Sequence, residues 1–313
     1  MLTAMKPVVI KSRMGLVEWS MLVLLSMLWG GSYFFVEIAL LEWSPLLIVA
    51  VRVVIASIVI WGIVLVAGLP VPRSRSAWVA FFWMGLLNNI FPFLLIVWGQ
   101  KEIESGLAAI LTAAAPIFTV IVAGVWLKDE PVTRAKLLGA ALGLIGVIIL
   151  IGPSALAGLD VGLLAQLAVL GGALSYAFAG AYARRFPRMN IDPIVAAAGQ
   201  LLMSSLIMIL LALMFEAPNE LIESSAKVWM AVGLMAVFST ALAYILYFRL
   251  LASAGATNAI LVTLLIPVTA ILLGALILDE RLQWLHFLGM AVIGLGLSVI
   301  DGRLWHRFIR PRK

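Results

Sequence analysis

The sequence predicts an all-α integral membrane protein with ten transmembrane helices, and three observations support this fold class. Of the 313 residues, 64% are apolar and 12% are charged, whereas a soluble protein carries about 25% charged residues. The mean hydropathy is +1.17, and a soluble core of this size cannot bury so many apolar side chains. The apolar residues also form continuous runs, and about 20 helical residues cross the hydrocarbon of a bilayer.

Ten apolar runs follow one another along the chain. Their continuous apolarity favours helices, because the strands of a membrane barrel alternate over about ten residues. The first run follows a basic N-terminal segment and is too long for the apolar region of a signal peptide. Prolines, glycines and charged residues separate the runs, for example at Pro45, 128–131 and 153–160. The predicted spans are 16–40, 46–69, 77–99, 104–127, 134–152, 161–183, 193–215, 227–249, 256–278 and 283–300.

The distribution of basic residues predicts the orientation, because cytoplasmic loops are enriched in Lys and Arg. With ten spans and a cytoplasmic N-terminus, 17 of the 21 Lys and Arg residues fall in cytoplasmic segments. Three fall in outer loops, and Arg52 lies within a span. Acidic residues are more frequent in the outer loops. We therefore expect both termini on the cytoplasmic side.

The two halves of the chain resemble each other. The segment SGLAAILTAAAPIFTVIVAGVWLKDE aligns with GATNAILVTLLIPVTAILLGALILDE, which places Pro116 against Pro267 with one residue of slack. Five spans per half is an odd number, so the second half must enter the membrane with the opposite polarity. The sequence thus predicts two inverted repeats, 1–152 and 153–313, within a single transmembrane domain. This architecture is common among secondary carriers.

The inverted repeat resembles the drug/metabolite transporter superfamily, in particular its EamA-type branch. The resemblance rests on LWGGSYFF in the first span, Arg52 in the second, and the two proline-centred spans that end in an acidic pair. It covers nearly the whole chain and implies a multi-pass transporter of the bacterial inner membrane. It further implies alternating access at a central cavity and, since relatives export amino acids, an amino-acid or similar exporter. The sixth span departs from the family pattern, because LSYAFAGAY supplies Tyr176 where Trp is usual.

Arg52 is the one charged residue predicted to lie well inside a span. It is about seven residues into the second span, or roughly 10 Å below the outer surface at ~1.5 Å per residue. A charge in a span costs several kcal/mol and usually faces a cavity or a partner. Arg52 either binds a substrate carboxylate or forms a fixed pair with Glu37 or nearby carbonyls. It stands seven residues after Pro45, as Gln200 stands seven after Pro193.

Polar and aromatic residues near the middle of the spans complete the predicted site. Aromatic side chains with hydrogen-bonding tips suit a small amphipathic solute such as an aromatic or branched amino acid. For each of them, contacts between helices or at the membrane interface are the alternative role. The predicted substrate-binding residues are Trp29, Tyr33, Arg52, Asn88, Asn89, Trp98, Tyr176, Gln200, Ser239 and Tyr244.

Pro116 and Pro267 are the predicted helix kinks. Each removes a backbone hydrogen bond, and the freed carbonyls are tolerated in a membrane where they line a cavity. Their presence in both halves favours a role in shaping a central pocket. A static kink needed only for packing is the alternative.

Several classes of function are disfavoured. No Asp or Glu lies in the middle of a span, which argues against a cation exporter that exchanges substrate for a proton at a buried carboxylate. The sequence shows no catalytic or metal-binding motif and contains no cysteine, so we expect no enzyme, metal or cofactor. Despite a pI near 9.8, the basic residues are scattered and predict no nucleic-acid partner. The rival function is a carrier of a phosphorylated or nucleotide-linked sugar or another organic anion, although Arg52 alone offers little positive charge.

The expected partners are a small-molecule substrate and the lipid bilayer. Two small-residue faces allow close approach of helices. They could support a homodimer, but packing within one chain is the simpler expectation, so we expect a monomer. These faces consist of Gly139, Gly143 and Gly146 in the fifth span and Gly289, Gly294 and Gly296 in the tenth.

Overall fold

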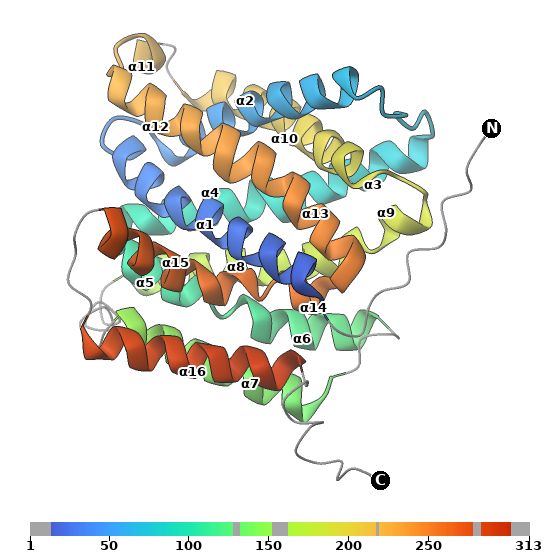
Figure 1. Cartoon of the computed structure of the whole chain (residues 1–313). Coiled ribbons are helices and arrows are strands. Elements are labelled where there is room, and N and C mark those ends of the chain that lie inside the picture. The colour runs from blue at the N-terminus through green and yellow to red at the C-terminus, as the bar shows by residue number, and fades with distance from the viewer. Residues whose placement is uncertain (1–13, 128–131, 152–161, 217–218, 278–282, 302–313) are drawn as a thin grey trace.

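The computed structural model describes residues 14–127, 132–151, 162–216, 219–277 and 283–301. Within these ranges every regular element is helical. The helices lie side by side and the chain passes back and forth between two ends of the bundle (Figure 1). Seven helices in the described ranges are long and apolar enough to cross a membrane, and shorter apolar helices are found at 256–269 and 284–300.

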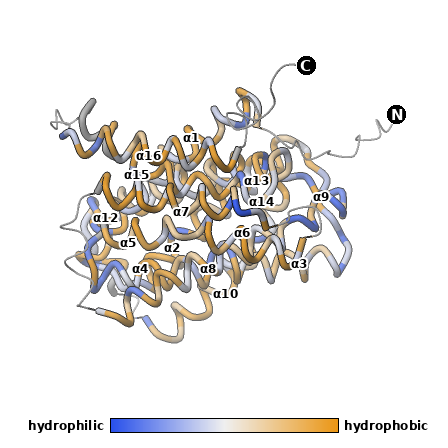
Figure 2. Tube along the Cα trace, turned by 90° about the horizontal axis from the view of Figure 1, so that it is seen from below, coloured by the Kyte–Doolittle hydropathy of each residue, from blue (hydrophilic) through white to orange (hydrophobic). Residues whose placement is uncertain are grey.

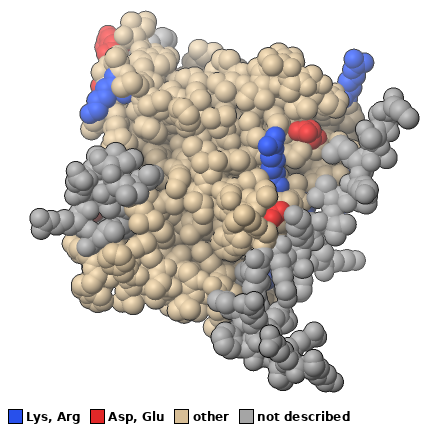
Figure 3. Space-filling view, in the orientation of Figure 1, with Lys and Arg blue, Asp and Glu red and all other residues tan. Residues whose placement is uncertain are grey.

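The surface fits a bilayer. Hydrophobic residues dominate along the helices, and hydrophilic residues gather where the helices end (Figure 2). On the face drawn in Figure 3, the described charged side chains lie toward the two ends and leave a broad uncharged area between them. Many large apolar side chains are exposed, among them Leu65, Val125 and Leu213. Lipid rather than water is therefore the natural contact of this surface.

The described residues of the first half form seven α-helices and one π-helical segment. They are α1 (Leu16–Ala39), α2 (Pro45–Val66), α3 (Arg75–Gly85), the π segment η1 (Leu86–Ile90), α4 (Phe91–Glu102), α5 (Ser105–Thr112), α6 (Ala115–Trp126) and α7 (Arg134–Ile151).

The second half repeats this order with short helices added. The elements are α8 (Leu163–Ala183), α9 (Arg185–Arg188), α10 (Pro193–Phe215), α11 (Asn219–Ile222), α12 (Ala226–Ala236), the π segment η3 (Val237–Leu242), α13 (Ala243–Ala254), α14 (Ala256–Ala259), α15 (Val262–Ile277) and α16 (Trp284–Asp301). The predicted boundary between the repeats at 152/153, and the acidic pairs at 129–130 and 279–280, lie outside the described residues.

Equivalent helices of the two halves begin with the same local signals. α2 and α10 both start with a proline in the first turn, where a missing amide costs nothing. Side chains of Ser44 and Asp192 cap these two helices. Ser74 and Ser225 cap α3 and α12 in the same way, each accepting a hydrogen bond from the amide three residues later.

Two predicted spans, 77–99 and 227–249, are not uniform α-helices. Each widens into a π segment that begins twelve residues after its capping serine. Segments η1 and η3 therefore occupy equivalent positions in the two halves. Such wide turns occur often at functional sites, because they turn side chains away from the regular helical positions.

The two proline-containing spans are broken rather than simply kinked. α5 ends at Thr112 and α6 begins at Ala115, so Pro116 lies in the first turn of α6 and not at the centre of a continuous helix. The second break falls at residues 260–261, between α14 and α15, and Pro267 lies inside α15. The break precedes Pro116 immediately but lies well before Pro267.

Helices of one half pack mainly against helices of the other. The central pair is α2 with α10, while α1 contacts α13 and α15, and α8 contacts α4 and α6. These contacts are related as expected for two similar halves. At one side α7 packs along α16, where a β-carbon on Gly296 would lie 2.6 Å from the Gly139 carbonyl oxygen. The two small-residue faces thus meet within one chain, except that Gly294 has nothing within 4 Å of its added β-carbon.

Candidate functional site

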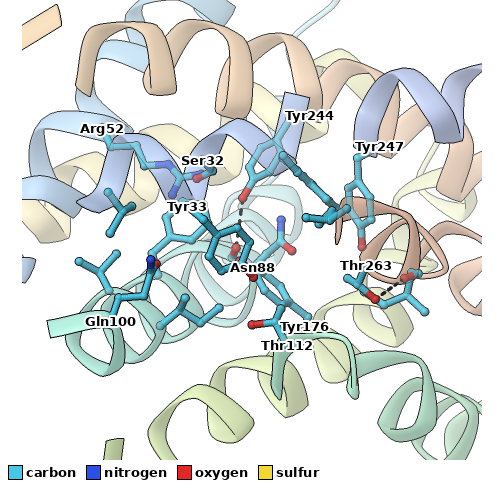
Figure 4. A pocket seen from close by; sticks show the side chains of 17 residues that line it. Ser32, Tyr33, Arg52, Asn88, Gln100, Thr112, Tyr176, Tyr244, Tyr247 and Thr263 are labelled. Carbon is cyan, nitrogen blue, oxygen red and sulfur yellow. Dashed lines mark hydrogen bonds between the residues drawn. The ribbon is translucent and has the colours of Figure 1, made fainter. Parts of the chain in front are cut away.

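A pocket opens inside the bundle between helices from both halves. Its empty volume is about 690 Å³, including the open space at its mouth. Figure 4 shows the side chains around it. The lining residues are Trp29, Ser32, Tyr33, Val36, Arg52, Asn88, Phe93, Ile96, Val97, Gln100, Thr112, Tyr176, Tyr244, Tyr247, Ile260, Thr263 and Ile266.

Among the described residues that line this pocket, Arg52 is the only charged one. Its side chain is 5% exposed. Its Nε donates a hydrogen bond of 2.8 Å to the Thr240 hydroxyl oxygen, and its guanidinium carbon lies 3.8 Å from the ring centroid of Phe93. A hydroxyl and an aromatic ring stabilise a cation but do not neutralise it.

Glu37, the alternative partner predicted for Arg52, does not form an ion pair with it. Glu37 is exposed on α1, and no carboxylate of the described residues forms an ion pair with Arg52. In Figure 4 the Arg52 side chain extends toward Ser32 and Tyr33 at the cavity. The guanidinium is therefore desolvated without a counter-ion, which is costly for an empty site and favourable for one that binds an anionic group.

Tyrosines form much of the remaining wall. Four of the five tyrosines of the chain line the cavity. The Trp29 and Tyr247 rings are 5.6 Å apart between centroids, and the Tyr244 and Tyr247 rings are 6.4 Å apart. Such rings offer apolar faces together with hydroxyl groups at their tips, so the wall suits an amphipathic solute.

Side chains of two other helices stabilise the π segment η1 by hydrogen bonds. Pro92 has no amide, so it cannot bond the carbonyl of Asn88 four residues earlier or that of Leu87 five residues earlier. The Ser175 hydroxyl donates to the Leu87 carbonyl oxygen at 2.7 Å. The Tyr244 hydroxyl lies 3.2 Å from the Asn88 carbonyl oxygen and 2.7 Å from the Asn89 side-chain oxygen. Helices α8 and α13 thereby fix the position of Asn88 at the cavity.

Six of the ten predicted site residues lie on the cavity wall, namely Trp29, Tyr33, Arg52, Asn88, Tyr176 and Tyr244. The other four do not line it. Asn89 is buried and donates to the Ser204 hydroxyl oxygen at 2.7 Å. Gln200 is buried and accepts from the Asn88 side chain at 3.2 Å. Ser239 is buried within η3, and Trp98 is exposed on the outside of α4.

The sequence argument did not select several polar lining residues. Tyr247 lies three residues after Tyr244, hence on nearly the same side of α13. Thr112 and Thr263 each stand four residues before one of the repeated prolines, and that spacing was an available signal. Gln100 also lines the cavity, and its side-chain nitrogen is buried without a hydrogen-bond partner among the described residues.

The lining offers polar, charged and aromatic groups that can bind a solute. It combines one guanidinium with hydroxyls, amides and aromatic rings. A search of the described residues finds no group of three or more His, Cys, Asp or Glu side chains that could hold a metal ion. These features support recognition of a carboxylate next to an apolar or aromatic group.

Comparisons with known proteins show to which family the chain belongs. The family model described as "EamA-like transporter family" matches residues 18–152 and 163–300. The chain is 26% identical over 278 residues to the uncharacterized inner membrane transporter YedA of Escherichia coli (strain K12), covering 88% of each chain. It is 26% identical over 297 residues to a probable amino-acid metabolite efflux pump of the same organism, covering 92% of this chain and 96% of that protein.

A more distant bacterial relative and a solved structure extend the likeness. The uncharacterized transporter YoaV of Bacillus subtilis (strain 168) is 23% identical over 276 residues, which cover 88% of this chain and 94% of that protein. One crystal structure superposes with a TM-score of 0.71 at 19% identity, covering 93% of this chain and 98% of that chain, and it supports the fold. The protein is a multi-pass bacterial inner-membrane transporter, and it belongs to the EamA-like transporter family of the drug/metabolite transporter superfamily.

Proposed function

We propose that this protein exports, or facilitates the passage of, small metabolites that carry a carboxylate and an apolar group. Neutral amino acids, and aromatic ones in particular, are the preferred substrates. The observation that carries the proposal is the buried Arg52, which has no carboxylate partner among the residues that the structure describes. Arg52 lies on a cavity lined by four tyrosines. The name of the relative described as a probable amino-acid metabolite efflux pump supports the same substrate class.

We further propose ten spans with both termini in the cytoplasm and two inverted repeats, 1–152 and 153–313, that enclose the cavity. Alternating access then follows from two similar gates on opposite sides of one site. The contacts of α1 with α13 and of α8 with α4 support this symmetry. The close packing of the two glycine faces within one chain supports a monomer as the working unit.

Counterflow in proteoliposomes tests the proposal. Purified protein is loaded with one unlabelled amino acid and then exposed to traces of labelled ones, without a pH or voltage gradient. Accumulation of label for neutral amino acids is the expected result. Uptake of sugar phosphates or nucleotide-linked sugars in place of amino acids would instead establish the rival anion carrier.

The role of Arg52 is tested with the variants Arg52→Gln and Arg52→Lys. The first removes the charge and should reduce counterflow of carboxylate-bearing solutes about tenfold or more, because a charge-assisted bidentate pair is lost. The second keeps the charge but not the planar fork and should recover part of the activity. Arg249→Gln, which changes an exposed arginine, is the matched control. Normal counterflow by well-folded Arg52→Gln protein would disprove the carboxylate-binding role.

A further inference from the structure

The repeat brings two corresponding pairs of polar side chains to the cavity. Arg52 and Gln200 each stand seven residues after the proline that begins their helix, α2 or α10. Each bonds to the π segment of the other half. The Arg52 Nε donates to the Thr240 hydroxyl oxygen in η3 at 2.8 Å, and the Gln200 side-chain oxygen accepts from the Asn88 Nδ2 in η1 at 3.2 Å. One pair is charged and the other is neutral.

Each pair presents one of its members to the solute. Arg52 lines the cavity in the first pair and Asn88 lines it in the second, whereas Thr240 and Gln200 do not belong to the lining. Asn88 is the third residue of η1 and Thr240 the fourth residue of η3. The match between the halves is therefore close without being identical, and it yields a cavity with one cationic and one neutral polar group.

The Asn88 amide keeps an acceptor for the cavity. Its nitrogen is engaged by Gln200, which is 0% exposed. Its oxygen has no hydrogen-bond partner in the described part of the chain and yet is not enclosed by protein atoms. Because Asn88 lines the cavity and is 2% exposed overall, this oxygen is left for a donor from the solute.

Three helices fix the position of this acceptor. Gln200 of α10 holds the side chain of Asn88, and the Tyr244 hydroxyl of α13 lies 3.2 Å from the Asn88 carbonyl oxygen. Ser175 of α8 bonds the carbonyl of Leu87, one residue earlier, at 2.7 Å. A polar group that its surroundings hold in place discriminates between solutes better than a mobile one.

The space between the two polar groups suits an aromatic ring. Figure 4 shows Asn88 apart from Arg52, with Tyr33 between them. The side chains of Trp29 and Phe93 also line this cavity, and aromatic rings pack favourably on one another. A matching solute has a carboxylate at one end, a ring in the middle and a neutral hydrogen-bond donor at the other end.

We propose that Asn88, positioned by Gln200, forms a second subsite that accepts a hydrogen bond from a neutral hydroxyl or N–H group on the ring of the solute. This inference rests on the proposed function and deepens it, because it divides the aromatic amino acids. Tyrosine offers a ring hydroxyl to Asn88, whereas phenylalanine leaves the acceptor unpaired. A site built to bond a hydroxyl group disfavours the analogue that lacks it.

Calorimetric binding of matched solutes to the purified protein tests the subsite. The probes are tyrosine, phenylalanine and 4-fluorophenylalanine, which differ only at the far end of the ring. The wild type should bind tyrosine about tenfold more tightly than either of the others, since the bond to Asn88 forms in a site shielded from water. 4-Fluorophenylalanine occupies the place of the hydroxyl without donating, so it separates hydrogen bonding from size.

The variant Asn88→Leu/Gln200→Leu replaces both partners by apolar groups of similar size, a change that leaves no buried amide unpaired. It should still bind phenylalanine and should reduce the preference for tyrosine to within about twofold. Ser204→Ala is the matched control, because Ser204 bonds Asn89 of the same π segment but does not line the cavity. It should keep the preference.

Two further variants separate the roles of the two polar groups. Gln200→Leu retains Asn88 but no longer orients its amide, so it should lose part of the preference. This variant keeps the proposal testable if the double variant does not fold. Arg52→Gln should weaken binding of all three probes and leave their ratio unchanged, because the carboxylate is common to them.

The outcomes distinguish this inference from the proposed function. Equal affinity of the wild type for tyrosine and phenylalanine would overturn the Asn88 subsite and leave the carboxylate site standing. The same conclusion would follow from an unchanged preference in the folded double variant or, where only that variant folds, in Gln200→Leu. Failure of the wild type to bind any of the three probes would overturn the proposed preference for aromatic amino acids itself.

Discussion

Tyr244 connects three parts of the protein through one hydroxyl group. It is 2% exposed on α13, and its hydroxyl contacts the side-chain oxygen of Asn89 and the carbonyl oxygen of Asn88 in η1. The same residue lines the cavity. A side chain that bonds the π segment and lines the proposed binding site links stability to recognition.

We predict that Tyr244→Phe lowers the free energy of unfolding by about 1 kcal/mol, because a buried hydrogen bond within a membrane protein contributes roughly this much. Thermal unfolding in detergent measures the change. Tyr182→Phe is the matched control, since the Tyr182 hydroxyl is buried without a hydrogen-bond partner in the described part of the chain and its removal should cost nothing. Equal losses for the two variants would show that the hydroxyl contacts of Tyr244 do not matter for stability.

Glu42 gives a prediction for pH. It lies in the turn after α1, and hydrogen bonds from the Ser225 hydroxyl and from the Ser225 amide, the latter at 2.7 Å, hold the pKa of Glu42 below its ordinary 4.5. A carboxyl group whose pKa is lower in the folded state stabilises the fold above its unfolded-state pKa. That contribution is lost as the pH falls through the folded-state pKa.

The melting temperature of Glu42→Gln should therefore lie below that of the wild type at pH 7, and the gap should close as the pH falls below 4.5. Thermal scans of both proteins across this range make the comparison. A gap that stays constant with pH would mean that the charge of Glu42 does not strengthen its bonds to Ser225.

The sequence predicted how deep each site residue lies in the membrane, but not toward which side of its helix the side chain points. Asn88 and Asn89 lie at the same depth, yet one lines the cavity and the other bonds Ser204. A helix turns about 100° per residue, so two neighbouring residues point in different directions. The π segment η1 further rotates the directions of the side chains around the helix axis, and this rotation depends on contacts with other helices. Gln200 was predicted from its match to Arg52 in the repeat, but it serves as the hydrogen-bond acceptor of Asn88.

At the scale of elements, the repeat explains more than hydropathy does. Hydropathy located the apolar helices closely, and the predicted span 193–215 coincides with α10. It could not reveal η1 and η3, because a π turn changes hydrogen-bond register without changing apolarity. In the sequence, Pro92 marks the position of η1. The residue at the equivalent position after η3 is Ala243, so the sequence contains no such mark for η3. The equivalent positions of the two segments show that the widening belongs to the fold.

The packing of α7 against α16 gives a prediction at this scale. A β-carbon on Gly296 would lie 2.6 Å from both the Gly139 carbonyl oxygen and the Gly143 amide nitrogen. Since these are backbone atoms, the helices must separate, and such overpacking costs about 1–3 kcal/mol. We expect Gly296→Ala to lower the free energy of unfolding by this amount, as measured by denaturation in detergent micelles.

Gly294→Ala is the control for that variant. It lies on the same helix two residues away, and its added methyl group meets nothing within 4 Å, so helix propensity should leave stability unchanged or raised by up to about 1 kcal/mol. Two variants of equal stability would refute close packing of α7 on α16. Concentration-dependent loss of a dimer on Gly294→Ala would instead assign this face to contact between two copies.

At the scale of the whole molecule, both halves contribute residues to the cavity. α1 and α2 supply Trp29 and Arg52, while α8, α13 and α15 supply Tyr176, Tyr244 and Thr263. Neither half can enclose a solute alone. If the halves are inverted as proposed, motion of one half relative to the other exposes the same wall first at one end of the bundle and then at the other.

This mechanism requires that the connections alternate between the two sides of the membrane, with the basic ones inside. The chain has no cysteine, so a single introduced thiol can be labelled without background. Ser76 and Glu223 are exposed near the starts of α3 and α12, which are equivalent positions in the two repeats. Parallel repeats would place both residues on one side, whereas inverted repeats place them on opposite sides.

We predict that a membrane-impermeant maleimide labels Glu223→Cys in right-side-out spheroplasts and labels Ser76→Cys only after permeabilisation. The basis for this assignment is electrostatic, because Arg73 and Arg75 flank the start of α3 while Lys227 is alone at α12, and loops rich in Lys and Arg stay in the cytoplasm. Labelling of both thiols after permeabilisation confirms that each is accessible. Labelling of both before permeabilisation would exclude inverted repeats, and the opposite pattern would reverse the orientation while leaving the inversion intact.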